Sequence, residues 1–328
     1  MEQLFMKNNL LFFKVIPRQA IWGGNRVRKY FGYDVPDTTG QVWAFSAQAD
    51  GETICQNGSF KGFGLKKLWE DYPELFESKN KSFPYIISLV APVDNLSVQV
   101  HPTDTVAKKL GYENGKNEAW VLLKTESKTS LIYGSKIPIS DLLKGIKSQD
   151  FNNIFNSQDT KQGDFFYIPA GTIHGLGKGN IAYEIQQSTD LTFRVYDYER
   201  REKDGRARKL DIPDAIESIK NSNPQNNTTL NFVHPKARDL INNKNVSVRE
   251  YINNESFVIT NITVKGRFEL SKQGYWLTTV SEGSGKLNGA KIQFSDNFIV
   301  PATTDKVILE GNFTLMITSE KRTIVEGS

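Results

Sequence analysis

Two similar stretches, GDFFYIPAGTIH at residues 163–174 and SDNFIVPATTDK at residues 295–306, decide the fold of this chain. Aligned without gaps, they share an aspartate, a phenylalanine, a proline and an alanine at the same positions. Each reads as a short apolar strand that ends at a Pro-Ala turn, after which a new strand begins. We therefore expect two copies of one structural unit. In the second copy, Lys306 stands where the first has His174.

Strand patterns dominate the rest of the chain. Segments rich in aromatic and β-branched residues are bounded by Gly, Pro, Asn and Asp, which is typical of short strands joined by turns. The predicted strands are 41–47, 84–90, 96–101, 118–124, 130–134, 165–168, 181–187 and 192–198. Helix patterns are fewer, at 64–77 with an interruption at Pro73, 103–110, 138–155 with Ser140 as the N-cap, and 211–220.

This pattern predicts a mainly β fold of two β-barrel, or jelly-roll, units with a few helical insertions. We expect a metal-binding catalytic unit at residues 1–220, a polar linker at 221–244 and a degenerate unit at 245–328. The last of these has no histidine, so we expect it to bind no metal and to serve packing.

Composition and charge exclude several classes of protein. The net charge of +4 over 328 residues is small and is spread without a basic tract, so neither nucleic acid nor a membrane surface is an expected partner. No run of about 18 apolar residues occurs, and the N-terminus lacks the features of a signal peptide. The single cysteine, Cys55, rules out an intramolecular disulfide and favours a cytoplasmic protein. Oligomeric state leaves no signal in the sequence.

Only three histidines occur, and their contexts are informative. Gln99 and His101 are two apart in the strand pattern LSVQVH, so both side chains face the same side of the strand. His174 follows the Pro-Ala-Gly turn with the spacing G-x5-P-x-G-x2-H, which is the second sequence motif of the cupin barrels. His234 precedes a proline beside the polar linker, and we interpret it as structural.

A carboxylate completes a possible metal site. Glu118 opens the next predicted strand, in GKNEAW at residues 115–120. A carboxylate, two imidazoles and an amide oxygen form a mixed nitrogen and oxygen donor set that suits Zn²⁺ and leaves a position for water or substrate. Iron or manganese would accept the same donors.

Three blocks together resemble the type I mannose-6-phosphate isomerases, in particular their short bacterial form. They are residues 96–120 (LSVQVHPTDTVAKKLGYENGKNEAW), residues 169–201 (PAGTIHGLGKGNIAYEIQQSTDLTFRVYDYERR) and IWGG at 21–24. The resemblance covers most of residues 15–220. It implies a zinc-dependent cupin enzyme of carbohydrate metabolism with one Zn²⁺ per chain, held by Gln99, His101, Glu118 and His174. Water can take the place of Gln99 in short forms.

The resemblance also implies roles for the other polar residues of these blocks. Arg194 matches the active-site arginine of the family, and Lys116, Glu184 and Asp190 match its acid, base or substrate-orienting groups. Ser97 and Arg200 match positions at the phosphate end of the substrate. Lys178, which departs from the family pattern, and Trp22 are further candidates for substrate contacts; a core role is the alternative for Trp22. Ser88 stands where family members usually carry a lysine, which leaves a different sugar phosphate as an alternative substrate.

The implied reaction interconverts mannose 6-phosphate and fructose 6-phosphate through an enediolate. A metal ion can stabilise the charge on oxygen, a carboxylate can move the proton between the two carbons, and cations can anchor the phosphate. Glu184, Asp190 and a zinc-bound water all remain candidates for the base. The alternatives from other classes are a non-catalytic sugar-binding cupin and an iron-dependent cupin dioxygenase.

Overall fold

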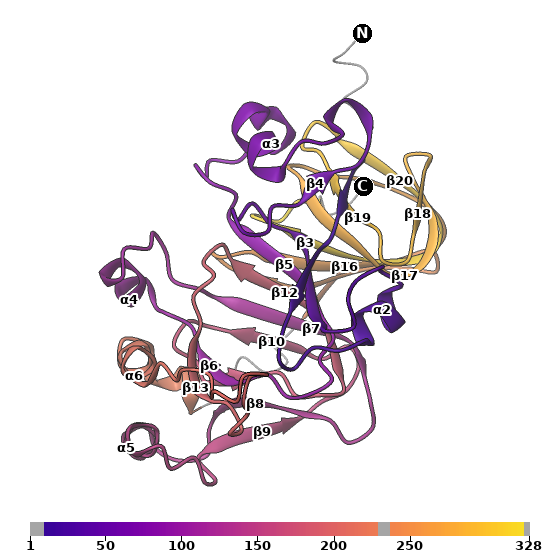
Figure 1. The fold of residues 1–328 in the computed structure, drawn as a ribbon. Coiled ribbons are helices and arrows are strands. Elements are labelled where there is room, and N and C mark those ends of the chain that lie inside the picture. Colours follow the sequence, from indigo (N-terminus) through magenta and orange to yellow (C-terminus); the bar gives the residue numbers. More distant parts are fainter. Residues whose placement is uncertain (1–9, 229–236, 325–328) are drawn as a thin grey trace. The chain divides into compact units, whose positions relative to one another are not determined.

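The computed structural model of this chain describes residues 10–228 and 237–324 and divides into two compact units. We call residues 17–42 and 88–235 the central unit, and residues 1–16, 43–87 and 236–328 the terminal unit. Each unit is therefore assembled from segments distant in the sequence (Figure 1). Among the described residues, no helix has the length and apolar character needed to cross a membrane.

The central unit is built on two sheets, and strands β3 and β5 of the first sheet also contain residues that are counted with the terminal unit. One sheet has six strands in the order β10-β7-β12-β5-β3-β2, and the other has five in the order β13-β6-β11-β8-β9. The bounds in the first sheet are β2 (Ile16–Gln19), β3 (Thr39–Phe45), β5 (Tyr85–Val90), β7 (Glu118–Thr125), β10 (Phe165–Ile168) and β12 (Asn180–Gln187). Those in the second are β6 (Val98–Val100), β8 (Ser130–Ser135), β9 (Phe155–Asp159), β11 (His174–Gly175) and β13 (Phe193–Tyr196). The predicted mainly β fold is confirmed.

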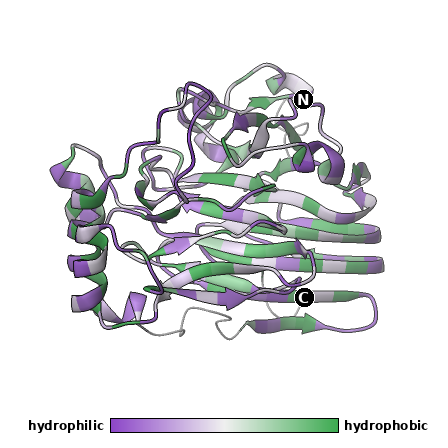
Figure 2. Ribbon diagram, turned by 60° about the horizontal axis from the view of Figure 1, so that its bottom comes forward, coloured by the Kyte–Doolittle hydropathy of each residue, from purple (hydrophilic) through white to green (hydrophobic). Residues whose placement is uncertain are grey.

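The alternation of side chains decides what faces the inside of the central unit. Val98 and Val100 of β6 pack in one apolar cluster with Leu142 of α5 (Ile139–Ser148) and Ile219 of α6 (Ile212–Lys220). In Figure 1 α6 lies beside β13 and β6, and α5 lies next to α6. Because neighbouring residues of a strand point to opposite sides, Gln99 must point away from the helices, into the space between the sheets. Figure 2 shows this alternation as bands of hydrophobic and hydrophilic residues along the strands.

A second apolar cluster fills part of that space. It includes Trp22, Trp120, Tyr133 and Phe166, all buried. The two remaining helices of the central unit are α2 (Arg26–Phe31) and α4 (Asp104–Lys109), the latter N-capped by Thr103, which accepts a hydrogen bond from the Val106 amide.

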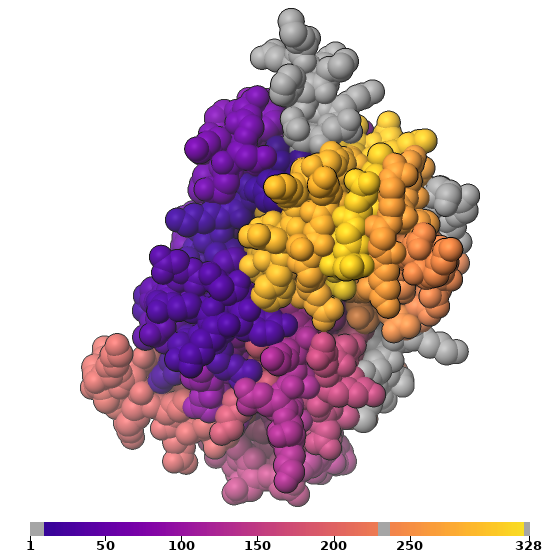
Figure 3. All heavy atoms as spheres, turned by 90° about the vertical axis from the view of Figure 1, so that its right-hand side faces the viewer, coloured from indigo at the N-terminus to yellow at the C-terminus, as the bar shows by residue number. Residues whose placement is uncertain are grey.

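The terminal unit is a nine-stranded sheet in the order β14-β15-β16-β20-β17-β19-β1-β4, with β18 paired to β17. Its strands are β1 (Leu11–Lys14), β4 (Ile54–Cys55), β14 (Arg238–Asn242), β15 (Val246–Asn253), β16 (Val258–Ser271), β17 (Trp276–Leu287), β18 (Ala290–Gln293), β19 (Asn297–Val300) and β20 (Lys306–Ser319). Helix α3 (Leu65–Asp71) and the 3₁₀ turns η1 (Gly58–Phe60) and η2 (Pro73–Leu75) complete it. In Figure 3 its last strands, orange to yellow, form one continuous surface on the side shown.

The same turn precedes β10 and β19, which supports the predicted repetition. In the central unit Asp164 accepts a hydrogen bond from the Lys161 amide through Oδ2 at 2.8 Å. In the terminal unit Asp296 accepts one from the Gln293 amide through the same oxygen at 2.9 Å. In the reverse direction, the Asp164 amide donates to the Lys161 carbonyl oxygen at 3.1 Å, and the Asp296 amide donates to the Gln293 carbonyl oxygen at 3.0 Å. Two copies of one unit explain this correspondence better than chance strand-turn chemistry.

The register of the two turns shows which residues of the terminal unit correspond to Glu118 and His174. The last residue of β10 pairs with Glu118, whereas the last residue of β19 pairs with Trp276. Likewise β11 begins with His174 and β20 with Lys306. Tryptophan and lysine therefore occupy the positions that Glu118 and His174 hold in the central unit.

Two local predictions need correction, and two strands were missed. The helix expected at 138–155 ends at Ser148, because β9 begins at Phe155 and pairs with β8. Ser140 is not its N-cap, since Pro138 holds that position without a side-chain hydrogen bond. Strands β1 and β2, of four residues each, were not predicted. The break at Pro73 is confirmed, since α3 ends at Asp71.

Candidate metal centre

Three buried side chains of the central unit meet between its sheets. The Nε2 atom of His101 lies 2.7 Å from Oε2 of Glu118 and 3.1 Å from Nε2 of His174. All the potential ligand atoms lie within 4.8 Å of one another, and each residue is at most 1% exposed. This is the geometry of donors that surround one point.

The strands bring these residues together from distant parts of the sequence. Glu118 opens β7 and His174 opens β11, while His101 directly follows β6. The turn before His174 depends on Gly171, whose φ of +82° belongs to the left-handed region that glycine adopts freely. A β carbon there would also come within 2.3 Å of Ser222. The glycine of the sequence motif is therefore a steric requirement for delivering the histidine.

Gln99 occupies the middle position of a three-strand row. It is the register partner of His174 on β11 and of Arg194 on β13. Its amide nitrogen lies 3.3 Å from His174 Nε2, and its amide oxygen accepts a hydrogen bond from Ser97 at 3.3 Å. Half a turn of the amide would present the oxygen to the cluster, so Gln99 is within reach as a fourth donor.

The main chain orients both imidazole rings. The Nδ1 atom of His101 lies 3.2 Å from the carbonyl oxygen of Leu191, and that of His174 lies 2.9 Å from the carbonyl oxygen of Thr172. A carbonyl oxygen only accepts, so each Nδ1 carries the proton and each Nε2 presents a lone pair. Such outer contacts are typical of metal-binding histidines.

The environment keeps both rings neutral. Burial, followed by the nearby Lys116 ammonium, holds the pKa of His101 well below its ordinary value. Burial, followed by His101, lowers the pKa of His174 to about 3. Neutral imidazole is the form that binds a metal ion.

The donor set fits a divalent cation. Two Nε2 lone pairs that face each other at 3.1 Å repel unless a proton or a cation lies between them. In addition, Glu118 Oε1 is buried and has no hydrogen-bond partner in the described part of the chain. An orphaned carboxylate oxygen beside two lone pairs is the arrangement that a metal ion satisfies.

Two further titratable groups border the cluster. The Lys116 side chain is 4% exposed, and its Nζ lies 3.9 Å from Glu118 Oε2. Glu184, on β12, accepts a hydrogen bond from Trp120 Nε1 at 3.0 Å. Burial, followed by the charge of Glu118, raises the pKa of Glu184 to about 8. The site thus contains a buried cation and a second carboxyl group beside the donors.

The other residues singled out in the sequence fall in three different environments. Arg194 is half-buried beside Gln99, and Arg200 is bound to Asp197 and to the carbonyl oxygen of Asn95. Asp190 and Lys178 are exposed. Trp22 is 8% exposed and packs in the apolar cluster of the central unit. His234 lies outside the described residues.

Sequence reasoning missed Asn227, which supports the turn that carries His174. It lies in η3 (Pro224–Asn227), within the segment expected to be a linker, and is 2% exposed. Its Oδ1 accepts a hydrogen bond from the Ile173 amide at 2.6 Å, and its Nδ2 donates to the Gly171 carbonyl at 2.7 Å. A polar Asn-rich segment gives no sign of such a long-range contact, so no local signal identified it.

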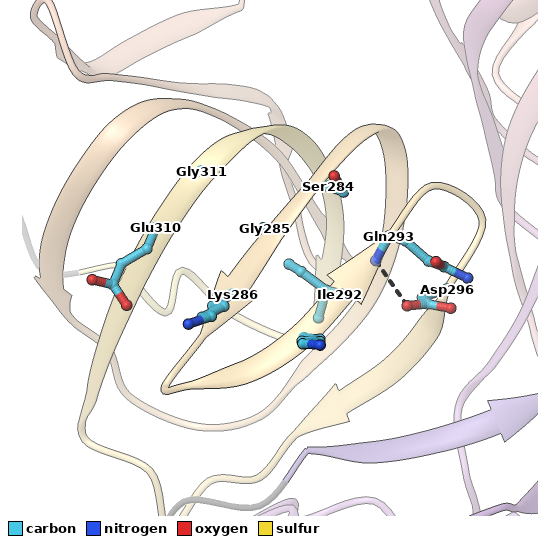
Figure 4. A pocket seen from close by; sticks show the side chains of 9 residues that line it. Ser284, Gly285, Lys286, Ile292, Gln293, Asp296, Glu310 and Gly311 are labelled. Atoms are coloured by element: carbon cyan, nitrogen blue, oxygen red, sulfur yellow. Dashed lines mark hydrogen bonds between the residues drawn. The ribbon is translucent and has the colours of Figure 1, made fainter.

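The terminal unit contains a groove of about 750 Å³ with different chemistry (Figure 4). Its lining carries both charges, from Lys286, Lys291, Glu310 and Asp296. Asp296 accepts a hydrogen bond from the Gln293 amide, drawn as the dashed line. None of its lining residues is a histidine. The donor chemistry therefore places the candidate site in the central unit rather than in this groove.

The sequence of the chain is similar to those of known proteins. Residues 11–126 match the family model described as phosphomannose isomerase type I, catalytic domain. A Bacillus subtilis protein described as "Probable mannose-6-phosphate isomerase GmuF" is 36% identical over 94% of this chain and 98% of its own length. The mannose-6-phosphate isomerase of Streptococcus mutans is 32% identical over 96% and 97% of the two chains.

A solved structure gives the same relationship in three dimensions. The crystal structure of the mannose 6-phosphate isomerase from Bacillus subtilis superposes with a TM-score of 0.88 at 30% identity. The match covers 95% of this chain and 99% of that one. The similarity therefore extends through both units.

Proposed function

The chain belongs to the phosphomannose isomerase type I family, and we propose that it interconverts mannose 6-phosphate and fructose 6-phosphate with one bound Zn²⁺. The convergence of His101, Glu118 and His174 is the observation that carries this proposal. The substrate follows from the names of the relatives, and the need for a metal follows from the donor set. A cytoplasmic location is part of the proposal, since free sugar phosphates are cytoplasmic metabolites and Cys55 is an unpaired, buried thiol.

His101, Glu118 and His174 would hold the ion, with Gln99 or water as a further ligand. Two imidazoles and a carboxylate are a donor set of catalytic zinc, although iron and manganese accept it too. The bound ion supplies a Lewis acid that favours negative charge on a substrate oxygen.

Glu184 is the best-placed group to move the proton between C2 and C1. It is buried beside the donors, whereas Asp190 is exposed. A carboxylate in this position takes the proton from one carbon, leaves an enediolate, and returns the proton to the other carbon. A metal-bound water is the remaining alternative for this role.

Lys116 and Arg194 are the two cationic side chains that we assign to the reacting end of the substrate. The buried Lys116 ammonium is close enough to stabilise negative charge as it develops on the sugar oxygens. Arg194 on β13 is the neighbour of Gln99 on β6, and β6 lies between Arg194 and His174 on β11. Ser97, Arg200 and Lys178 would hold the phosphate end, and Trp22 supports the site from its core.

A coupled assay of mannose 6-phosphate turnover tests the proposal. We expect activity that a chelator abolishes and Zn²⁺ restores, and that Glu118→Gln removes while the exposed-site control Glu126→Gln leaves it unchanged. If the protein converts another phosphosugar but not mannose 6-phosphate, it is an isomerase of a different sugar phosphate. Metal binding without turnover of any phosphosugar would identify a non-catalytic sugar-binding protein.

A further inference from the structure

Two arginines of the central unit share one buried carboxylate. Asp197 directly follows β13 and is 5% exposed. Arg208 donates from Nε to its Oδ2 at 2.8 Å and from Nη2 to its Oδ1, so this pair is bidentate. Arg200 donates to the same Oδ1. One carboxylate therefore fixes the planes of two guanidinium groups.

Arg200 is held from further directions. Its Nε donates to the carbonyl oxygen of Asp197 at 3.2 Å, and its Nη1 donates to that of Asn95. Its guanidinium lies 5.3 Å from the centre of the Tyr198 ring. Side chains restrained in this way lose little freedom when they bind a ligand.

The pair lies next to Arg194. Arg194 Nη1 donates to the carbonyl oxygen of Lys209 at 3.0 Å, one residue along the chain from Arg208. Burial, followed by the charge of Arg208, lowers the pKa of Arg194. Arg194 is in turn the register partner of Gln99. A continuous row of groups thus leads from the metal donors to the two arginines.

Positive charge exceeds negative charge in this group. Asp197 is buried, and Asp211 is half-buried and paired with Lys209 at 3.2 Å. The exposed Asp94 lies 3.7 Å from Arg200, so the three arginines and Lys209 face three carboxylates. Arg194 Nε is buried and has no hydrogen-bond partner among the described residues, and Arg208 uses Nε and Nη2 in its bonds to Asp197. The side chains of Arg200 and Arg208 are only 12% and 16% exposed, so this excess favours a bound anion.

We propose that Arg208 supplies a second guanidinium to the phosphate group of the substrate, and that Asp197 is the positioning residue that holds Arg208 beside Arg200. This inference rests on the proposed function, because it takes a phosphosugar as the ligand. The phosphate is remote from the reacting carbons, so a site at the far end of the row orients the sugar without touching the chemistry.

The test compares Arg208→Gln, Arg208→Lys and Asp197→Asn with Arg206→Gln and Asp204→Asn. The last two are matched controls, because Arg206 and Asp204 form an exposed ion pair in the same hairpin, with Arg206 86% exposed. Calorimetric titration with inorganic phosphate measures the anion site directly, and steady-state kinetics with mannose 6-phosphate measures KM and kcat. Zinc content checks that the metal centre is intact.

We expect Arg208→Gln to weaken phosphate binding and to raise KM by about tenfold or more, with a much smaller change in kcat. Arg208→Lys should recover part of this loss, Asp197→Asn should act in the same direction, and both controls should match the wild type. Unchanged phosphate binding and KM in Arg208→Gln would overturn the inference, even if its melting temperature fell. If the wild type binds phosphate through Arg208 but does not turn over mannose 6-phosphate, the anion site stands and the proposed function fails.

Discussion

His174 lies directly opposite Gln99 across the β11 and β6 pairing, although 75 residues separate them in the sequence. This pairing aims an imidazole and an amide at the same point from neighbouring strands, because register partners stand side by side on one face of a sheet. A slip of one residue would turn His174 to the opposite face. The metal centre therefore depends on strand register as much as on the identity of its donors.

Loss of the carboxylate donor should abolish tight metal binding. Glu118→Gln keeps the shape of the side chain but removes its negative charge, so we expect zinc affinity to fall by more than about 100-fold. Competition with a chromogenic chelator measures this affinity. Glu126→Gln on the surface is the control. Equal zinc affinity in wild type and Glu118→Gln would show that the ion binds elsewhere.

Zinc should stabilise the folded protein. A ligand present at about 1,000 times its Kd adds about 4 kcal/mol to the free energy of unfolding if it does not bind the unfolded chain. We expect the melting temperature of the chelated protein to rise when Zn²⁺ is added. The same addition should leave a His101→Ala, His174→Ala double variant unchanged. A matching rise in that variant would point to a different zinc site.

Asn227 should support the metal centre from outside it. Asn227→Ala leaves the Ile173 amide and the Gly171 carbonyl without their partners, which should cost about 2–4 kcal/mol in the free energy of unfolding. Because the turn then loosens around His174, zinc affinity should fall by about tenfold. Urea unfolding and chelator competition measure the two effects. Asn221→Ala, at an exposed helix end, is the control; identical zinc affinity in both variants would refute the supporting role.

The Asp197 carboxylate should make the stability of the protein depend on acid pH. Although burial alone would raise it, hydrogen bonds from Arg208 and Arg200 hold the pKa of Asp197 below its ordinary value. The unfolded chain then binds the proton more tightly than the folded chain, so this contribution is complete above about pH 4 and is lost as pH falls through the lowered pKa. Asp197→Asn should therefore reduce the free energy of unfolding at pH 7 and at pH 5, with a difference that narrows toward pH 3. A difference that stays constant over this range would contradict the assignment.

Lys272 should be essential to the terminal unit. Lys272 is 2% exposed. Its ammonium donates to the carbonyl oxygens of Gly274, Pro301 and Thr304, which uses all three of its protons. Lys272→Met keeps the length of the side chain but leaves these carbonyls unsatisfied, so we expect a loss of at least about 3 kcal/mol. Urea unfolding measures it, with the exposed Lys291→Met as the control. A variant as stable as that control would show that water replaces the ammonium.

Local pattern was sufficient for most strands of the central unit and for selecting the residues of the candidate metal centre. Alternation of apolar residues marks a strand wherever one face is buried, and most predicted strands agree with β3 to β13 within one to three residues. The donors were recognisable because histidine is scarce and because Gln99 and His101 share a face at a spacing of two. The predicted boundaries of elements were wrong where a long-range contact decided them. The helix predicted to residue 155 ends at Ser148, and the residues from Phe155 onward pair with β8 as strand β9.

What the sequence by itself determined is the set of groups available for chemistry and the strand on which each one stands. Only the tertiary structure decided which carbonyl oxygens orient the two imidazoles, that Asn227 supports the turn before His174, and that Asp197 joins Arg200 to Arg208. It also decided that each compact unit draws on separate segments of the chain. The physical reason is that side-chain direction along a strand follows from local geometry, whereas these contacts follow from which strands and loops pack together.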